Sequence, residues 1–308
     1  MVLDIIVGLF QAAVRIATPY LLASLGETID QNSGVLNLGV EGIMLLGAFA
    51  GFAGASFTGN IFLGLFFGIF FGGLAGLLMA FLSVTLRTDQ TITGVVIVIL
   101  LEGLVAYLLR IIFGTSVLPS LHWLETIEIP ILSQVPIIGP ILFKQNPLTY
   151  FAIILAFVLW FILFKTNFGL KIRAVGENPK AADTFGVDVF KIRYICVVFG
   201  GAIAGLAGCA LSLTYVKFFA EWMIGGRGWI AVSLVILGRW NPLKVLAASL
   251  LFGGADALQM RLQSYLGLQF PYQMFLVIPY ILAIVTLVIV SRRRGGPSSL
   301  AIPYSRED

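Results

Sequence analysis

The fold class of this chain follows from residues 42–86, GIMLLGAFAGFAGASFTGNIFLGLFFGIFFGGLAGLLMAFLSVTL, because none of them carries a formal charge. The run is more than twice the roughly 20 residues that one helical crossing of a bilayer requires. Its polar residues gather between Ser56 and Asn60, where we expect the chain to turn. The stretch therefore predicts two membrane-spanning helices joined by a short polar connection.

The composition of the whole chain extends this pattern. Hydrophobic residues make up 59% and charged residues 11%, whereas soluble domains are about 25% charged. We expect an all-α polytopic transmembrane bundle, a single domain over 1–308, with nine crossings in a range of about eight to ten. Residues 228–240 are too short for a full crossing and follow a glycine-rich Gly225–Gly228 turn, so a broken or re-entrant helix is expected there. The expected crossings lie near 5–26, 36–54, 61–86, 91–113, 149–166, 194–215, 228–240, 243–263 and 271–291.

The distribution of positive charge indicates the topology. The loop 165–193 holds six Lys or Arg residues between apolar segments, and short cytoplasmic loops collect such residues. If the 165–193 loop is cytoplasmic, counting crossings from it places the C-terminus in the cytoplasm too. The same count places the 114–148 loop outside, where we expect a folded cap or an interfacial segment. The net charge of +4 therefore indicates topology and not nucleic-acid binding.

A short helix is predicted inside the 165–193 loop. Asn178 can cap free backbone amides, and Pro179 suits the first helical position. Gly186 suits the left-handed residue that ends a helix. We expect a helix from Pro179 to Phe185 that presents Ala181, Ala182 and Phe185 to a partner. A simple solvated loop would not require this order of cap, proline, alanines and glycine.

The loop resembles the cytoplasmic coupling segment of ATP-binding cassette importer permeases of the branched-chain amino acid, ribose and nucleoside group. Two further motifs carry the resemblance, SGVLNLGVEGIMLLGAFAGF at 33–52 and GGRGWIAVSLVILGRWNP at 225–242. With the spacing of the apolar segments they cover most of the chain. The match is closest to nucleoside-type permeases within the simple-sugar branch, because Asn37 stands where ribose permeases typically carry an acidic residue.

The resemblance implies a type II importer permease in a bacterial plasma membrane. A cytoplasmic ATPase subunit would bind ATP and Mg and dock on the coupling helix, while this chain would bind no cofactor. A second permease, as a paralogue or an identical copy, and an extracytoplasmic solute-binding protein are the other implied partners. The sequence is consistent with a separate ATPase, since it contains no Gly-Lys dipeptide of a phosphate-binding loop. The residues implied in coupling are Gly176, Asn178, Pro179, Ala181, Ala182 and Gly186.

Polar residues within apolar segments are candidates for the translocation path, because charged side chains are costly in a membrane. We expect Asn37 and Glu41 to line that path, although an ion pair between Glu41 and an intramembrane arginine is an open alternative. Asp256 and Gln259 lie about one helical turn apart and could face the path or a partner subunit. Glu102 is expected to make a structural pair.

Two other classes of transporter remain open from the sequence. A secondary transporter could couple ions through Glu41, Glu102 or Asp256, but it would not explain the coupling-like loop. A channel would need pore-lining rings that sequence does not reveal. We expect no metal site and no catalytic constellation, since His122 is the one histidine. The chain is therefore expected to be a permease and not an enzyme.

Overall fold

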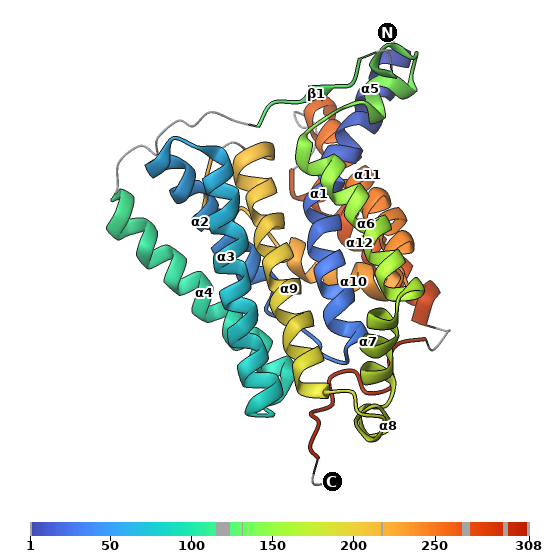
Figure 1. Cartoon of the computed structure of the whole chain (residues 1–308). Helices are drawn as coiled ribbons and strands as arrows, with labels where there is room; N and C mark the ends of the chain where they lie inside the picture. Colours follow the sequence, from blue (N-terminus) through green and yellow to red (C-terminus); the bar gives the residue numbers. More distant parts are fainter. Residues whose placement is uncertain are drawn as a thin grey trace.

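The structure, a computed structural model, describes residues 2–114, 124–130, 132–216, 218–266, 272–291 and 295–306. It consists almost entirely of helices, as the sequence predicts (Figure 1). The long helices are α1 (Val2–Asn32), α2 (Val40–Thr58), α3 (Ile61–Ala80), α4 (Gln90–Phe113), α6 (Pro147–Lys165), α9 (Val189–Ala210), α11 (Pro242–Leu266) and α12 (Tyr272–Ser291). The shorter helices are α5 (Ile138–Leu142), α7 (Asn167–Glu177), α8 (Pro179–Thr184) and α10 (Arg227–Leu237). Two π-helical segments, Phe81–Thr85 and Leu211–Tyr215, extend α3 and α9.

Helices α1, α2 and α9 supply most of the buried core of the bundle. Every residue of α2 from Val40 to Ala55 is buried. By contrast, α3, α4 and α6 expose large apolar side chains such as Phe66, Ile99 and Phe157. An apolar surface of this extent marks a membrane-facing side. The polar residues in the C-terminal half of α1 are therefore buried, and the apolar faces of α3, α4 and α6 lie on the outside of the bundle.

The glycine repeat of α3 lets this helix lie directly against α9. A Cβ atom at Gly72 would lie 2.6 Å from the carbonyl oxygen of Gly201, and one at Gly205 would overlap the carbonyl oxygen of Gly68. Small residues at this spacing allow helix backbones to approach closely in membranes. The two cysteines of α9, Cys196 and Cys209, are buried and form no disulfide.

The expected count of nine crossings is not confirmed. Among the described residues, seven helices are long and apolar enough to cross a membrane. Helix α10 has 11 residues and a length of about 16 Å, roughly half of the 30 Å hydrocarbon layer. Helix α12 contributes the shorter apolar helical stretch Val277–Thr286, which is not counted among the seven. The predicted break before α10 is confirmed, because residues 218–226 contain no helix.

The first two predicted crossings also change their limits. Helix α1 continues to Asn32, six residues beyond the predicted 5–26 segment. Residues 33–39 are then irregular, so that α2 begins at Val40 and not near residue 36. Gly34, with φ of +90°, reverses the chain after α1. The main-chain amides of Ser33 and Val35 bond back to the carbonyl oxygen of Asp30 and close this turn.

The 114–148 loop contains a small folded unit in its described part. Strand β1 (Ile127–Glu128) pairs antiparallel with β2 (Lys144–Gln145). Lys144 forms an ion pair of 3.0 Å with Glu128 across the two strands. This agrees with the folded cap expected from the sequence, whereas His122 lies outside the described residues. A 3₁₀ turn at Leu132–Gln134 and α5 complete the unit.

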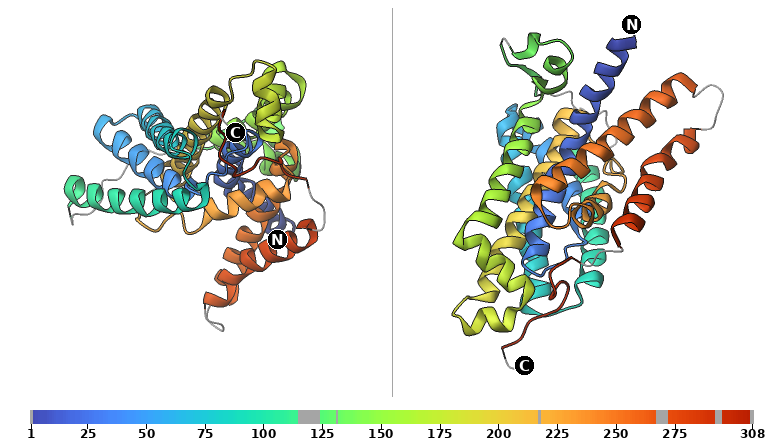
Figure 2. Two further views of the ribbon diagram at one scale, coloured as in Figure 1. Left: turned by 90° about the horizontal axis from the view of Figure 1, so that it is seen from below. Right: turned by 90° about the vertical axis from the view of Figure 1, so that its right-hand side faces the viewer.

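The two ends of the bundle carry different elements. The start of α1 lies beside α5 at one end, while α8 and residues 295–306 lie at the opposite end (Figures 1 and 2). The 165–193 loop and the C-terminal segment 295–306 are therefore on the same side of the molecule. This places two segments more than a hundred residues apart in sequence within contact distance.

Candidate functional site

The short helix α10 is held at its N-terminus by a buried carboxylate. Glu41 Oε1 accepts a hydrogen bond of 2.7 Å from the Gly226 amide, and Oε2 accepts one of 2.6 Å from the Gly228 amide. A Cβ atom at Gly228 would lie 2.5 Å from the Glu41 nitrogen, so glycine permits this approach. Negative charge is favourable at the positive end of a helix. Glu41 therefore anchors the start of α10 to α2.

A second acidic residue connects three helices next to this anchor. Asp256 of α11 accepts a hydrogen bond of 2.8 Å from the Tyr20 hydroxyl of α1. The same Oδ2 atom lies 3.8 Å from the guanidinium of Arg227, which follows the turn into α10. The Arg227 guanidinium also lies 5.9 Å from the centre of the Tyr20 ring. Buried charges need such partners, and here each has one.

Asp256 and Gln259 both line a cavity of about 660 Å³. The volume falls in the range of about 300–1,000 Å³ that is typical of small-molecule sites. The non-helical segment before α10 forms part of its wall, and such backbone is tolerated at membrane depth where it lines a cavity. The cavity thus combines aromatic rings with a few charged and amide groups. Its aromatic and polar lining residues are Tyr20, Tyr215, Phe218, Trp222, Tyr280, Arg227, Asp256, Gln259 and Gln263.

Asn37 and Glu41 do not lie on this cavity. The Asn37 amide donates a hydrogen bond of 3.3 Å to Asp30, and its Oδ1 accepts one of 3.0 Å from the Gly39 amide. Both Asn37 and Glu41 are buried, with exposed fractions of 0% and 7%. The structure therefore separates the four predicted path residues into a cavity pair, Asp256 and Gln259, and an internal pair.

Sequence reasoning missed the polar network around the end of α1. Glu27 Oε1 accepts hydrogen bonds of 2.8 Å from the Gln31 amide group and 3.1 Å from the Asn37 main-chain amide. Gln31 in turn accepts a 2.6 Å bond from the Trp240 indole. Glu27 and Asp30 are almost completely buried. The spacing of Glu27 and Gln31 at i and i+4 was the available signal, but both residues lie beyond the predicted end of the first crossing.

Glu102 does not occupy the internal paired position that the sequence predicts. Its residue is exposed on α4, on the surface of the described chain. The buried face of α4 is formed by other residues, such as Val98 and Leu101. Glu102 therefore makes no buried pair within the described part of this chain, and the expectation of a structural pair is wrong for the single subunit.

The 165–193 loop folds locally as predicted. Asn178 Oδ1 accepts a hydrogen bond of 3.0 Å from the Ala181 amide, and Pro179 is the first residue of α8. Gly186 has a φ of +81°, the left-handed conformation that ends the helix. The helix ends at Thr184 and not at Phe185, which becomes its C-terminal cap.

The surface of α8 differs from the prediction at one alanine. Phe185 is 88% exposed, in agreement with a presented face. Ala182 is buried and belongs to the hydrophobic core, so the expectation that it is presented is wrong. The Val187 main-chain amide donates a hydrogen bond of 3.0 Å to the Ala182 carbonyl oxygen, so the chain after Gly186 returns to this residue.

Gly176 joins the loop to the bundle. A Cβ atom at this position would overlap the carbonyl oxygen of Asn32, the last residue of α1. Glycine therefore allows the end of α7 to lie directly on the end of α1. No side chain lies between the two backbones at this point.

The described residues form no group of three or more His, Cys, Asp or Glu side chains that could hold a metal ion. The chemistry of the site is that of binding and movement: hydrogen bonds, one buried ion pair and aromatic faces around a cavity. Away from the cavity, at the end of the bundle that holds the 165–193 loop, the chain presents the short, exposed helix α8.

Comparisons with known proteins agree with this geometry. Residues 9–287 match the family described as branched-chain amino acid transport system / permease component. The guanosine ABC transporter permease protein NupQ of Bacillus subtilis is 38% identical, with 95% of each chain covered. The nucleoside ABC transporter permease protein NupC of Lactococcus lactis is 32% identical, covering 94% of this chain and 93% of the relative.

A further relative is a provisionally assigned glucose ABC transporter permease protein, TsgC13, of Haloferax volcanii. It is 42% identical, covering 83% of this chain and 78% of the relative. No solved structure matches significantly. The family match covers most of the chain, including the α10 anchor, the cavity and the 165–193 loop. This multi-pass membrane protein therefore belongs to the family of branched-chain amino acid transport system permease components and is a permease subunit of an ATP-binding cassette transporter.

Proposed function

We propose that this permease imports nucleosides and is driven by a separate ATPase that docks on the 165–193 loop. The observation that carries the proposal is α8, a capped short helix with an exposed Phe185 beside it and a direct backbone contact from α7 to α1. Such a helix can receive a push from a soluble partner and pass it into the bundle. The nucleoside and guanosine permeases among the relatives support the choice of substrate.

The cavity beside α10 suits a nucleoside as part of the translocation path. Gln259 and Asp256 can hydrogen-bond to ribose hydroxyls or base edges, and Trp222 and Tyr280 offer aromatic faces on which a base can stack. Trp222 is 80% exposed, so its ring is accessible. In this proposal Asn37 and Glu41 shape the path from behind, by holding the turn after α1 and the start of α10.

The proposed assembly contains the partners that an importer of this family requires. They are a cytoplasmic ATPase that carries ATP and Mg, a second permease copy or paralogue, and an extracytoplasmic solute-binding protein. This chain itself would bind no cofactor. The basic 165–193 loop supports a cytoplasmic position for α8, and the C-terminal segment lies at the same end of the bundle. The proposed location is the bacterial plasma membrane, with the C-terminus in the cytoplasm.

A simple sugar is the second candidate substrate. The glucose permease relative favours it, since its sequence identity of 42% is higher than that of the nucleoside permeases. Both candidates share the hydroxyl-rich ring that Asp256 and Gln259 would bind. They differ in the base, which would use the aromatic residues of the cavity.

The test is uptake by the purified complex in proteoliposomes that contain the ATPase and binding protein. We expect ATP-dependent uptake of labelled guanosine, and a several-fold loss in Gln259→Ala because the cavity loses one of its two glutamine amides. Gln134→Ala is the matched control, since Gln134 is exposed in the 114–148 loop. Uptake of glucose but not guanosine would favour the sugar, and ATP-independent uptake that follows an ion gradient would refute an importer.

A further inference from the structure

The C-terminal segment 297–306 lies across the junction between the 165–193 loop and the centre of the bundle. The Ser299 amide donates a hydrogen bond of 2.9 Å to the Gly176 carbonyl, and the Ala301 amide donates one of 3.2 Å to the Gly34 carbonyl. Ser298 Oγ adds a 2.6 Å bond to Glu177. The segment therefore joins the end of α7 to the turn that follows α1.

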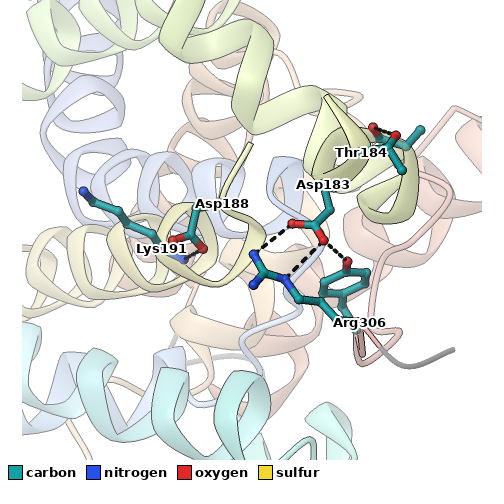
Figure 3. Close-up of polar contacts among 7 residues, drawn as sticks. Asp183, Thr184, Asp188, Lys191 and Arg306 are labelled. Carbon is teal, nitrogen blue, oxygen red and sulfur yellow. Dashed lines mark hydrogen bonds and ion pairs between the residues drawn. The ribbon is translucent and has the colours of Figure 1, made fainter. Parts of the chain in front are cut away.

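The last described residues of the segment hold α8 itself. Arg306 donates two hydrogen bonds to Asp183, of 3.1 Å from Nε and 3.0 Å from Nη2, and the two groups face each other in Figure 3. The Tyr304 hydroxyl donates a third, of 3.0 Å, to the same carboxylate. An arginine that meets a carboxylate with two donors fixes orientation as well as distance. Asp183 is thus held on the side of α8 that faces the segment.

The same segment is fixed to α9. The Tyr304 ring is buried and lies 5.7 Å from the ring of Phe190, near the start of α9. Arg193 is completely buried, and it donates 3.1 Å and 3.2 Å bonds to the carbonyl oxygens of Ile302 and Ser33. One guanidinium therefore joins the C-terminal segment, α9 and the turn after α1.

These contacts matter because α8 is very short and Ala182 is its one buried residue. It has six residues, far fewer than the roughly 12–15 that an isolated helix needs for even marginal stability. The helix is bounded by its cap residue Asn178 on one side and by the turn at Gly186 on the other. The C-terminal segment contacts α8 on one side and leaves Phe185 exposed beside it. A push on α8 can then reach α1 and α9 instead of turning the short helix in place.

We propose that residues 297–306 act as a C-terminal strap that fixes the coupling helix to α1 and α9, with Tyr304 and Arg306 as positioning residues. This inference rests on the proposed function, because it assumes that the ATPase acts on α8. The strap keeps α8 in the orientation that transmits ATPase closure. Its loss would let ATP hydrolysis continue while less substrate is moved.

The test measures substrate moved per ATP hydrolysed, using the complete transporter in proteoliposomes. Arg306→Gln combined with Tyr304→Phe should lower this ratio several-fold, while ATPase co-purification and hydrogen exchange of the membrane-spanning helices stay unchanged. Hydrogen exchange in 178–186 should rise. Exchanging the charges, by Asp183→Arg with Arg306→Asp, should recover most of the ratio. Lys171→Gln is the matched control, because Lys171 is an exposed cation on α7 at the same end of the bundle.

An unchanged ratio in the double variant would overturn the strap, as would a loss that the charge exchange does not recover. A parallel variant, Ala181→Glu with Phe185→Glu, separates this result from failure of the proposed function. Loss of ATPase association in that variant shows that α8 is the docking site. If the Arg306→Gln and Tyr304→Phe variant then keeps its ratio of substrate moved per ATP, the result counts against the strap alone. Retained association in the Ala181 and Phe185 variant would overturn the docking role, and the strap with it.

Discussion

Replacing Glu41 with glutamine tests whether a single buried carboxylate positions the broken helix of this permease. Glutamine has nearly the same size and shape, so the change leaves no cavity. It removes the negative charge, however, and replaces one acceptor oxygen by an NH₂ group. In the native protein both oxygens are occupied, by the Gly226 amide at 2.7 Å and the Gly228 amide at 2.6 Å. Glutamine can therefore satisfy one of these two donors and repels the other.

The expected cost has two parts. A buried amide left without an acceptor costs about 1–3 kcal/mol. Loss of the negative charge at the start of a helix costs about 0.3–1 kcal/mol, and up to about 2 kcal/mol when it is partly buried. Together they predict a destabilisation of about 3 kcal/mol. At about 2–4 °C for each kcal/mol, the thermal midpoint should fall by roughly 6–12 °C.

The assay is thermal unfolding of the purified protein in detergent, followed by hydrogen exchange at 226–232. The exchange should increase at the start of α10 before it changes elsewhere, because the anchor acts there. Glu221→Gln is the control, since Glu221 is an exposed carboxylate just before α10 and its loss should leave both measurements nearly unchanged. An unaltered midpoint and unaltered exchange in Glu41→Gln would refute the anchoring role.

Two further predictions concern packing and pH. Gly72→Ala should lower the yield of folded protein and cost about 1–3 kcal/mol of stability, because its Cβ would lie 2.6 Å from a backbone oxygen of α9. Gly103→Ala is the control and should have no such effect, since nothing lies within 4 Å of its Cβ. Equal yields of the two variants would count against direct backbone packing of α3 on α9. The second concerns Asp183, because hydrogen bonds from Arg306 lower the pKa of its carboxyl. Its pairing stabilises α8 fully above the ordinary aspartate pKa of about 3.9 and is lost as the pH falls through the lowered value. A spin label at Thr184 should therefore keep constant mobility from about pH 8 to pH 5 and become more mobile only below about pH 4; a change near pH 6 would contradict this assignment.

Much of the fold and part of the site could be predicted because they depend on local or repetitive features. The uncharged run 42–86 required membrane-spanning helices wherever they packed. Asn178, Pro179 and Gly186 each act on the few residues beside them, so cap, first turn and helix end were predictable. The same holds for the break before α10, where glycines precede a segment too short to cross. The structure supports this break, whereas the expected count of nine crossings is not confirmed.

The remaining features depend on which residues meet, and no local rule gives that information. The predicted first crossing ended at residue 26, before Glu27 and Asp30. In the structure both residues belong to α1 and are buried in the bundle, where they accept hydrogen bonds from Gln31 and Asn37 respectively. The sequence could not show that both carboxylate oxygens of Glu41 accept hydrogen bonds from the main-chain amides at the start of α10. Ala182 was expected to be exposed, because the pattern of a short helix does not show which of its residues packs into the core.

The amino-acid sequence alone establishes a helical membrane protein with a capped short helix between basic residues, because charge, hydropathy and capping act within one or two turns of the chain. The tertiary structure alone places Asp256 beside Tyr20 and Arg306 beside Asp183. Those partners are separated by more than a hundred residues, and only the packing of the helices brings them within hydrogen-bond distance.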